Sequence, residues 1–248
     1  MHRVLIQIGP FAVYSYGFFM AAAFLICVFL VRRNSDRFGV PSDKVMDCLV
    51  WLLIGGVVGG RLLFALINWH YYFQHPVRIF ALREGGMAFQ GSLAMAVLAG
   101  ALACRLKRIP FWRTGDFVAP YAALGHAVGR IGCFFNGCCY GRIIEKGLGV
   151  TFPGEPYMRI PTQIYSALFL LFLYLFLAGL REKKVFGGFV LSMYIIAYSA
   201  FRFFMGFLRG DTPAVLWGMK LSQLISAGML VSGAALLLIL HLRKHEGT

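Results

Sequence analysis

Charged side chains are scarce in this sequence, and acidic ones are the scarcest. Only 14% of the 248 residues are Asp, Glu, Lys or Arg, whereas soluble domains carry about 25%. Ten residues are acidic and 24 are Lys or Arg. Hydrophobic residues make up 59%, and several apolar runs approach the roughly 20 residues that cross a bilayer. The composition argues against a soluble domain and predicts an all-α, polytopic membrane protein.

The sequence also lacks an internal repeat and any stretch left over for a soluble domain. Its first apolar run has no small-residue cleavage site and is flanked by Arg3 and by Arg32-Arg33, which argues against a cleavable signal peptide. We therefore expect residues 1–248 to form a single integral-membrane domain. The net charge of +14 is then explained by membrane topology and predicts no nucleic-acid partner.

Apolar runs separated by short turn-forming breaks predict seven transmembrane helices. Their expected ranges are 12–31, 46–68, 88–104, 115–135, 162–180, 186–207 and 220–241. Thirteen of the 24 Lys and Arg residues fall in the loops 32–44, 105–113 and 181–184 and in the C-terminal tail, and eight fall on the opposite side. Because basic residues collect in cytoplasmic loops, we expect the N-terminus outside and the C-terminus in the cytoplasm.

Three arginines lie inside the expected helices. A charge near the bilayer centre costs at least about 2.5–3.5 kcal/mol unless it faces water or a partner. Only two carboxylates, Asp47 and Asp116, fall within an expected helix, and both lie near its cytoplasmic end. Arg61, Arg130 and Arg202 therefore need an external anion, and a phospholipid phosphate suits the planar guanidinium. The alternative is that their long side chains reach an interface.

Small residues are spaced regularly on several of these helices. Gly206 shares one helical face with Tyr198, Arg202 and Arg209, and would let another group approach that face. Other glycines have the GxxxG spacing of closely packed helices. These pairs are Gly55 with Gly59, Gly56 with Gly60, and Gly125 with Gly129.

Six stretches, in order along the chain, carry a resemblance to a known family. They are SYGFFM, GGRLLF, REGGMAFQGSL, GRIGCFFNGCCYGR, PTQIY and YSAFRFFMGFLR. The fourth, Gly129 to Arg142, resembles the family signature GRIGNFINGE-x-[WY]GR and is the longest and most specific. Over nearly its whole length, the sequence resembles the phosphatidylglycerol–prolipoprotein diacylglyceryl transferases.

The resemblance implies transfer of the diacylglyceryl group from phosphatidylglycerol to the lipobox cysteine in the signal-peptide region of a prolipoprotein, with release of glycerol phosphate. It implies the bacterial cytoplasmic (inner) membrane, an active site toward the outer, periplasmic side, and no metal or organic cofactor. Three alternatives stay open: a diverged paralogue that uses the same phospholipid site with another acceptor, an anion transporter, and a scaffold with a dead site.

The resemblance also assigns site residues. Arg130 and Arg202 fall on the family's two essential arginines, in agreement with the charge argument. In our hypothesis they bind the phosphate and stabilise the charge of the leaving group, while Tyr16, Asn136 and Tyr198 orient the headgroup. The complete predicted headgroup set is Arg130, Arg202, Tyr16, Asn136, Gly141, Arg142, Tyr198 and Arg61.

The sequence departs from the family pattern at three polar positions. Gln90 stands in place of a histidine, Cys133 in place of an asparagine and Cys138 in place of an acidic residue. Gln90 and Cys138 complete the predicted catalytic set with Arg130 and Arg202, although an amide is not a useful general base. The groups that stay open as the base are Glu84, His126 and Cys138.

Cys133, Cys138 and Cys139 allow four interpretations. Their spacing lacks the CxxC pairs that are typical of zinc sites, which weighs against a metal. The oxidising side of the membrane allows a disulfide. Small packing residues at a glycine-rich helix end and a direct chemical role for Cys138 are the other two.

Overall fold

The computed structural model describes residues 4–8, 11–81, 85–152, 154, 156–183, 185–210, 213–216 and 218–246. The candidate base Glu84 lies outside these residues. The chain forms two compact units, one of residues 1–30 with 115–248 and the other of residues 31–114. Each unit is described by itself below. The expectation of one domain over residues 1–248 stays a prediction.

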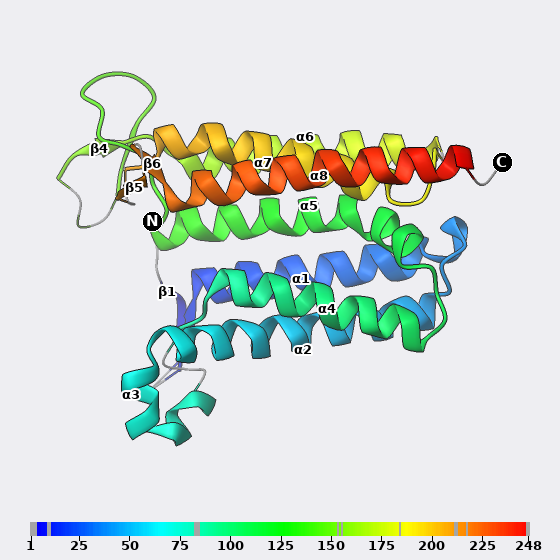
Figure 1. Ribbon diagram of the computed structural model, residues 1–248. Coiled ribbons are helices and arrows are strands. Elements are labelled where there is room, and N and C mark those ends of the chain that lie inside the picture. Colours follow the sequence, from blue (N-terminus) through cyan, green and yellow to red (C-terminus); the bar gives the residue numbers. More distant parts are fainter. Residues whose placement is uncertain are drawn as a thin grey trace. The chain divides into compact units, whose positions relative to one another are not determined.

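The first unit holds most of the helices (Figure 1). They are α1 (Ser15–Asn34), α5 (Phe111–Asn136), α6 (Thr162–Glu182), α7 (Phe189–Leu208) and α8 (Leu221–Glu246), with the last turn of α1 and the first of α5 in the other unit. Three antiparallel hairpins, absent from the all-α expectation, accompany them. These pair β1 (Val4–Ile8) with β2 (Phe11–Tyr14), β3 (Val150–Thr151) with β4 (Met158–Arg159), and β5 (Ala214–Leu216) with β6 (Met219–Lys220).

The core of the first unit forms where α5, α6 and α7 meet. Alanines at every fourth position of α5 leave room for leucines at helical spacing on α6. The buried residues are Ala119, Ala123, Ala127, Leu170, Leu173, Leu177 and Val190. Asp116 of α5 accepts hydrogen bonds from the backbone N–H groups of Gly188 (2.7 Å) and Leu191 (2.8 Å), and so caps the start of α7.

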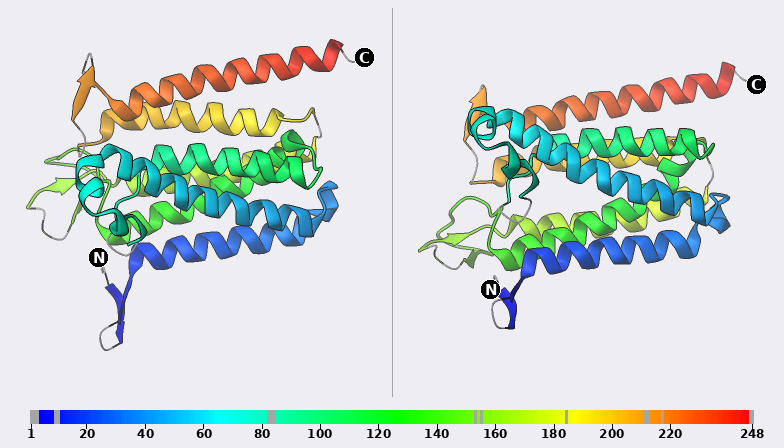
Figure 2. Two further views of the ribbon diagram at one scale, coloured as in Figure 1. Left: turned by 60° about the horizontal axis from the view of Figure 1, so that its bottom comes forward. Right: turned by 90° about the horizontal axis from the view of Figure 1, so that it is seen from below.

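The second unit is built on two helices in backbone contact. They are α2 (Ser42–Ile67) and α4 (Phe89–Leu106), with η1 (Asp36–Phe38), α3 (Trp69–Gln74) and η2 (Pro76–Phe80) around them. Both views in Figure 2 show α2 and α4 side by side. A Cβ added at Gly59 would lie 2.4 Å from the Gly91 carbonyl oxygen, and one at Gly55 would lie 2.7 Å from that of Met95. The expectation of close helix packing at this GxxxG pair is confirmed.

Six helices of the described chain are long and apolar enough to cross a membrane, namely α1, α2, α4, α6, α7 and α8. They match six of the seven expected ranges to within a few residues at each end. The range 115–135 also forms a helix, α5, but α5 is not among the six. Polar residues, among them Asp116, His126 and Arg130, make α5 less apolar than the other six helices. The chain is a multi-pass membrane protein, and membrane crossing by α5 remains a prediction.

Candidate functional site

The site is organised by the way in which α5 ends. The N–H of Cys138 donates to the carbonyl of Cys133 (3.2 Å), and the N–H of Gly137 donates to that of Phe134 (3.1 Å). With Gly137 at a φ of 71°, these two bonds form a Schellman motif, which satisfies carbonyls of the last helical turn. Asn136 is therefore the last residue of α5, and its side chain hydrogen-bonds to the Cys138 thiol.

The chain beyond this turn is tied to the segment just before α6 and to the end of α7. The N–H of Gly141 donates to the Ile160 carbonyl and that of Arg142 to the Leu208 carbonyl, both at 2.8 Å. A Cβ at Gly141 would lie 2.7 Å from the Ile160 Cβ and 2.8 Å from the Leu208 oxygen, so only glycine fits there. The Arg142 side chain is exposed. Gly141 thus holds the backbone in place, while Arg142 offers a side chain that is free to reach outward.

Arg130 and Arg202 are half-buried, and neither makes a hydrogen bond or an ion pair with another residue that the structure describes. The Nε of Arg130 is fully buried and has no hydrogen-bond partner among the described residues. Arg130 and Arg209 both lie close enough to Arg202 for their charges to act on it. Like charges in a poorly solvated place repel, so this group favours the binding of an anion.

Two of the tyrosines expected in the site lie beside these arginines. The charge of Arg130 acts on the half-exposed Tyr16 at the start of α1. Tyr198 of α7 interacts electrostatically with Arg202, one helical turn away. The ring of His126 packs on Tyr198, with centroids 5.0 Å apart. The first unit therefore brings Tyr16, Tyr198 and the candidate base His126 into the surroundings of the two arginines.

The cysteine cluster, defined as Cys133, Cys138 and Cys139, borders the same group. Its three Sγ atoms lie within 4.8 Å of one another, and all three are free thiols. Hydrogen bonds from Cys133 and Cys138 lower the pKa of Cys139, and the positive charges of Arg209 and Arg130 act in the same direction. These three cysteines form no disulfide with one another. A metal site, a packing role and a direct chemical role for Cys138 are all compatible with three neighbouring thiols.

The end of α7 is fixed by α8. The group that approaches Gly206 is Gln223, because a Cβ at Gly206 would lie 2.3 Å from the Gln223 Cγ. The Nζ of Lys220 donates to the Gly206 carbonyl (2.9 Å) and to the Arg209 carbonyl. A cation on these last carbonyls stabilises the helix end. Arg209 itself follows the helix rather than continuing its face, since α7 ends at Leu208.

Arg61, in the second unit, uses its guanidinium differently. It is 4% exposed, and its five N–H groups donate to carbonyls of the segment that follows α3. The acceptors are the carbonyls of Arg78, Ile79, Ala81, Gly85 and Gly86. In this arrangement Arg61 has no free N–H group with which to bind a headgroup, although the sequence predicts headgroup binding. Its place is that of a positioning residue that shapes the loop.

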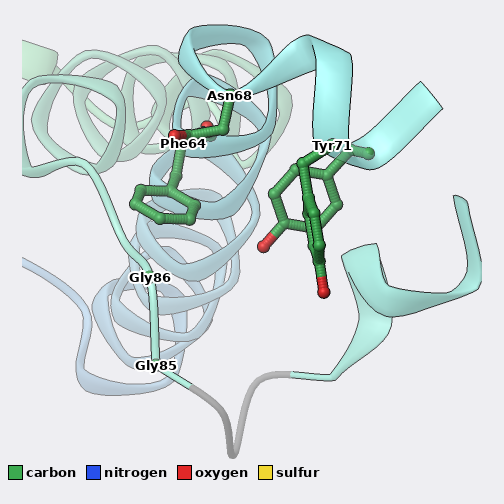
Figure 3. Close-up of a pocket in the computed structure, with 6 residues that line it drawn as sticks. Phe64, Asn68, Tyr71, Gly85 and Gly86 are labelled. Atoms are coloured by element: carbon green, nitrogen blue, oxygen red, sulfur yellow. The ribbon is translucent and has the colours of Figure 1, made fainter. Parts of the chain in front are cut away.

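That loop, α2 and α3 line an open cavity of about 260 Å³. Figure 3 shows Phe64 and Tyr71 on opposite sides of it, with the backbone of Gly85 and Gly86 along its edge. Its lining residues are Phe64, Asn68, Tyr71, Tyr72, Gly85 and Gly86. Gln90, in the first turn of α4, is exposed and does not line this cavity. Its catalytic assignment stays a prediction.

One buried side chain near the site escaped the sequence reasoning. Gln163 is 1% exposed, and its Nε2 donates to the Cys138 carbonyl (2.7 Å), while its Oε1 is buried without a partner in the described chain. Neighbouring Thr162 donates to the Cys139 carbonyl (2.8 Å). The motif PTQIY contains both residues, so a signal was present in the sequence. Only the fold shows that this motif holds the cysteine-bearing turn.

Comparison with known proteins gives a consistent result. The family model described as prolipoprotein diacylglyceryl transferase matches residues 3–239. A protein of Geobacter sulfurreducens named phosphatidylglycerol–prolipoprotein diacylglyceryl transferase is 36% identical over 97% of this chain and 96% of its own length. Proteins of the same name from Trichormus variabilis (35% identical) and Bacillus cytotoxicus (32%) align over 97% and 93% of the chain, and over 90% and 89% of their own lengths.

Proposed function

This chain belongs to the prolipoprotein diacylglyceryl transferase family, and from this premise we propose the reaction that it catalyses. It transfers the diacylglyceryl group of phosphatidylglycerol to the cysteine thiol of a prolipoprotein and releases glycerol phosphate. The names of its relatives support both substrates. The same relatives give the paralogue and transporter alternatives no support.

The observation that carries the proposal is that two half-buried cations have no anionic partner among the residues that the structure describes. Arg130 and Arg202 lie near one another without an anionic partner in the described chain. We assign them to the phosphate of phosphatidylglycerol, which can accept hydrogen bonds from two planar guanidinium groups. The binding of substrate would relieve their mutual repulsion. The half-exposed Tyr16, together with Asn136 and Tyr198, would orient the headgroup, and Arg142 would reach it from the loop.

The chemistry follows from this placement. The sulfur of the acceptor attacks the carbon of the diacylglyceryl group that is bonded to the phosphate oxygen. An S–C bond forms there while the bond between that carbon and the phosphate oxygen breaks. A general base or water takes the thiol proton, and glycerol phosphate departs with the electrons of the broken C–O bond. Arg130 and Arg202 stabilise the charge that grows on the departing phosphate, and removal of one such donor typically costs about 10²–10³ in rate. The acceptor cysteine belongs to the lipobox of the signal-peptide region.

The position of the site residues at the ends of their helices bears on the side of the membrane where the reaction takes place. The site residues lie at the N-terminal end of α1 and at the C-terminal ends of α5 and α7. We propose seven membrane spans, including α5, with the N-terminus outside the cytoplasm. The start of α1, and with it the site, then faces the periplasmic side of the bacterial inner membrane.

The test is transfer by the purified protein in vesicles that contain labelled phosphatidylglycerol and a lipobox peptide. We expect lipidated peptide and free glycerol phosphate in equal amounts. Arg130→Ala and Arg202→Ala should each lower the rate by at least about 10²-fold, and Arg202→Lys should lose most of it because lysine lacks the planar fork. Arg243→Ala, in the exposed end of α8, is the matched control and should transfer at the parent rate. Parent rates for both alanine variants would refute the phosphate assignment.

A further inference from the structure

The backbone conformation at the end of α5 brings the three side chains of the cysteine cluster together. A Schellman motif brings the side chain of its last residue back onto the helical turn that it closes, and here these two positions are Cys138 and Cys133. The Cys138 thiol also donates to the Cys133 carbonyl (3.7 Å). Cys139 then adopts a φ of 65°, and its Sγ joins the other two. Three thiols thus meet at one point although four residues separate the first from the second.

This backbone conformation is unusual for a residue other than glycine. A side chain in the left-handed region costs roughly 1–2 kcal/mol, and such outliers cluster at functional sites. Glycine at position 139 would avoid this cost. Small packing residues do not need such a conformation, so packing alone explains the cluster poorly. The strained conformation of Cys139 places its sulfur beside those of Cys133 and Cys138.

The sulfur positions fit a metal ion. Thiolates bound at about 2.3 Å from one ion lie roughly 3.8–4.0 Å apart, and the three Sγ atoms already lie within 4.8 Å of one another. Small rotations of the three side chains would bring the Sγ atoms to the separation that one bound ion requires.

We propose that Cys133, Cys138 and Cys139 bind one soft metal ion through three thiolates, and that Cu(I) is the ion that fits this donor set best. All three donors are sulfur, which selects Cu(I) among biological metals together with zinc and iron–sulfur clusters. Structural zinc sites take four protein ligands, whereas the group in the described chain offers three. Binding releases the protons of the three thiols, and no electron is transferred. This inference goes beyond the proposed function and does not depend on it.

The full-length protein in detergent, with Cys27, Cys48 and Cys104 replaced by Ala, is the form to test. This background is needed because the Sγ atoms of Cys48 and Cys104 lie 3.8 Å apart and form a second pair of thiols. The reduced protein is titrated anaerobically with Cu(I) in competition with a coloured Cu(I) chelator. We expect one equivalent to bind, with absorption from charge transfer between sulfur and copper.

Two variants in this background test the ligands. Cys133→Ser removes one sulfur, and Cys139→Gly removes another while it suits the positive φ of the turn, so the fold is retained. Each should weaken Cu(I) binding by more than the roughly 10–100-fold that loss of a hydrogen-bond partner of a metal ligand costs. Melting temperatures near that of the background protein verify that both variants are folded.

Several outcomes would overturn the site. These are no Cu(I) bound by the background protein, unchanged affinity in both folded variants, or Zn²⁺ bound through the same cysteines when Cu(I) is not. The titration contains neither phosphatidylglycerol nor peptide, so its failure leaves the transferase proposal untouched. A protein that binds Cu(I) but transfers no lipid would contradict the proposed function alone.

Discussion

The arginines within the helices of this protein differ in what their N–H groups face. Arg61 donates all five to backbone carbonyls, whereas Arg130 keeps a buried Nε without a partner in the described residues. Buried donors without partners are rare and costly. The first arrangement stabilises a loop, and the second favours an incoming anion. Residue type alone does not distinguish them, but the hydrogen bonds do.

Replacement of Arg61 should therefore affect stability. Arg61→Ala leaves five carbonyls without their charged donor, and hydrogen bonds to charged groups contribute about 1.5–3 kcal/mol each. We expect the free energy of unfolding in detergent to fall by at least about 2 kcal/mol. Arg105→Ala, at an exposed position of α4, should unfold like the parent. Equal denaturation midpoints for both variants would show that the carbonyl contacts do not stabilise the loop.

Cys138 allows the two proposals to be separated at a single residue. Cys138→Glu introduces the acidic residue of the family pattern and removes one thiol of the cysteine cluster. We expect transfer to stay at or above the parent rate while Cu(I) binding is lost. Both are measured on one preparation, by the vesicle assay and by the titration. Loss of transfer with unchanged copper binding would contradict both expectations.

At the scale of the helix, Gly59 and Gly179 both lie inside long apolar helices, but they differ in the space that a side chain would find around them. A Cβ at Gly59 of α2 would lie 2.3 Å from the Met95 Cβ and 2.4 Å from the Gly91 oxygen. A Cβ at Gly179 of α6 would meet nothing within 4 Å. Spacing along the sequence identifies the first as a packing glycine, yet only the fold shows how closely the two backbones approach.

These surroundings predict opposite effects for the same substitution. Gly59→Ala must push α2 and α4 apart, which overpacking data put at about 1–3 kcal/mol of destabilisation. Gly179→Ala should leave the melting temperature unchanged or raise it slightly, because alanine is the better helix former. Thermal unfolding of the two variants in the same detergent makes the comparison. A tolerated Gly59→Ala would mean that the helices have room to separate.

At the scale of the whole molecule, the proposed topology is tested by reporters. Fusions that end in the loops 32–44, 105–113 and 181–184 should be active with a cytoplasmic reporter, because these loops hold most of the basic residues. Fusions that end near residues 75 and 145 should be active only with a periplasmic reporter. Should α5 fail to cross, residues 105–113 and 145 would report the same side.

Much of the fold could be predicted because hydropathy acts over long stretches. A helix fills most of each of the seven expected ranges, and six of these helices have the length and hydropathy of membrane spans. The short hairpins were missed because two to five residues carry little periodic signal. Of the site, Arg130, Arg202, Tyr16 and Tyr198 were predicted and lie in one unit. The clustering of the cysteines was not predicted, because it depends on the left-handed turn at Gly137 and Cys139.

The five carbonyls around Arg61 have one more consequence. They form a receptor that matches the shape and the donors of a guanidinium ion, and that receptor belongs to a loop distant from Arg61 in sequence. In the Arg61→Ala protein, free guanidinium should enter the vacated space and restore part of the lost stability. A familiar denaturant would then act as a chemical rescue agent at low concentration, an effect that sodium chloride at equal ionic strength should not reproduce.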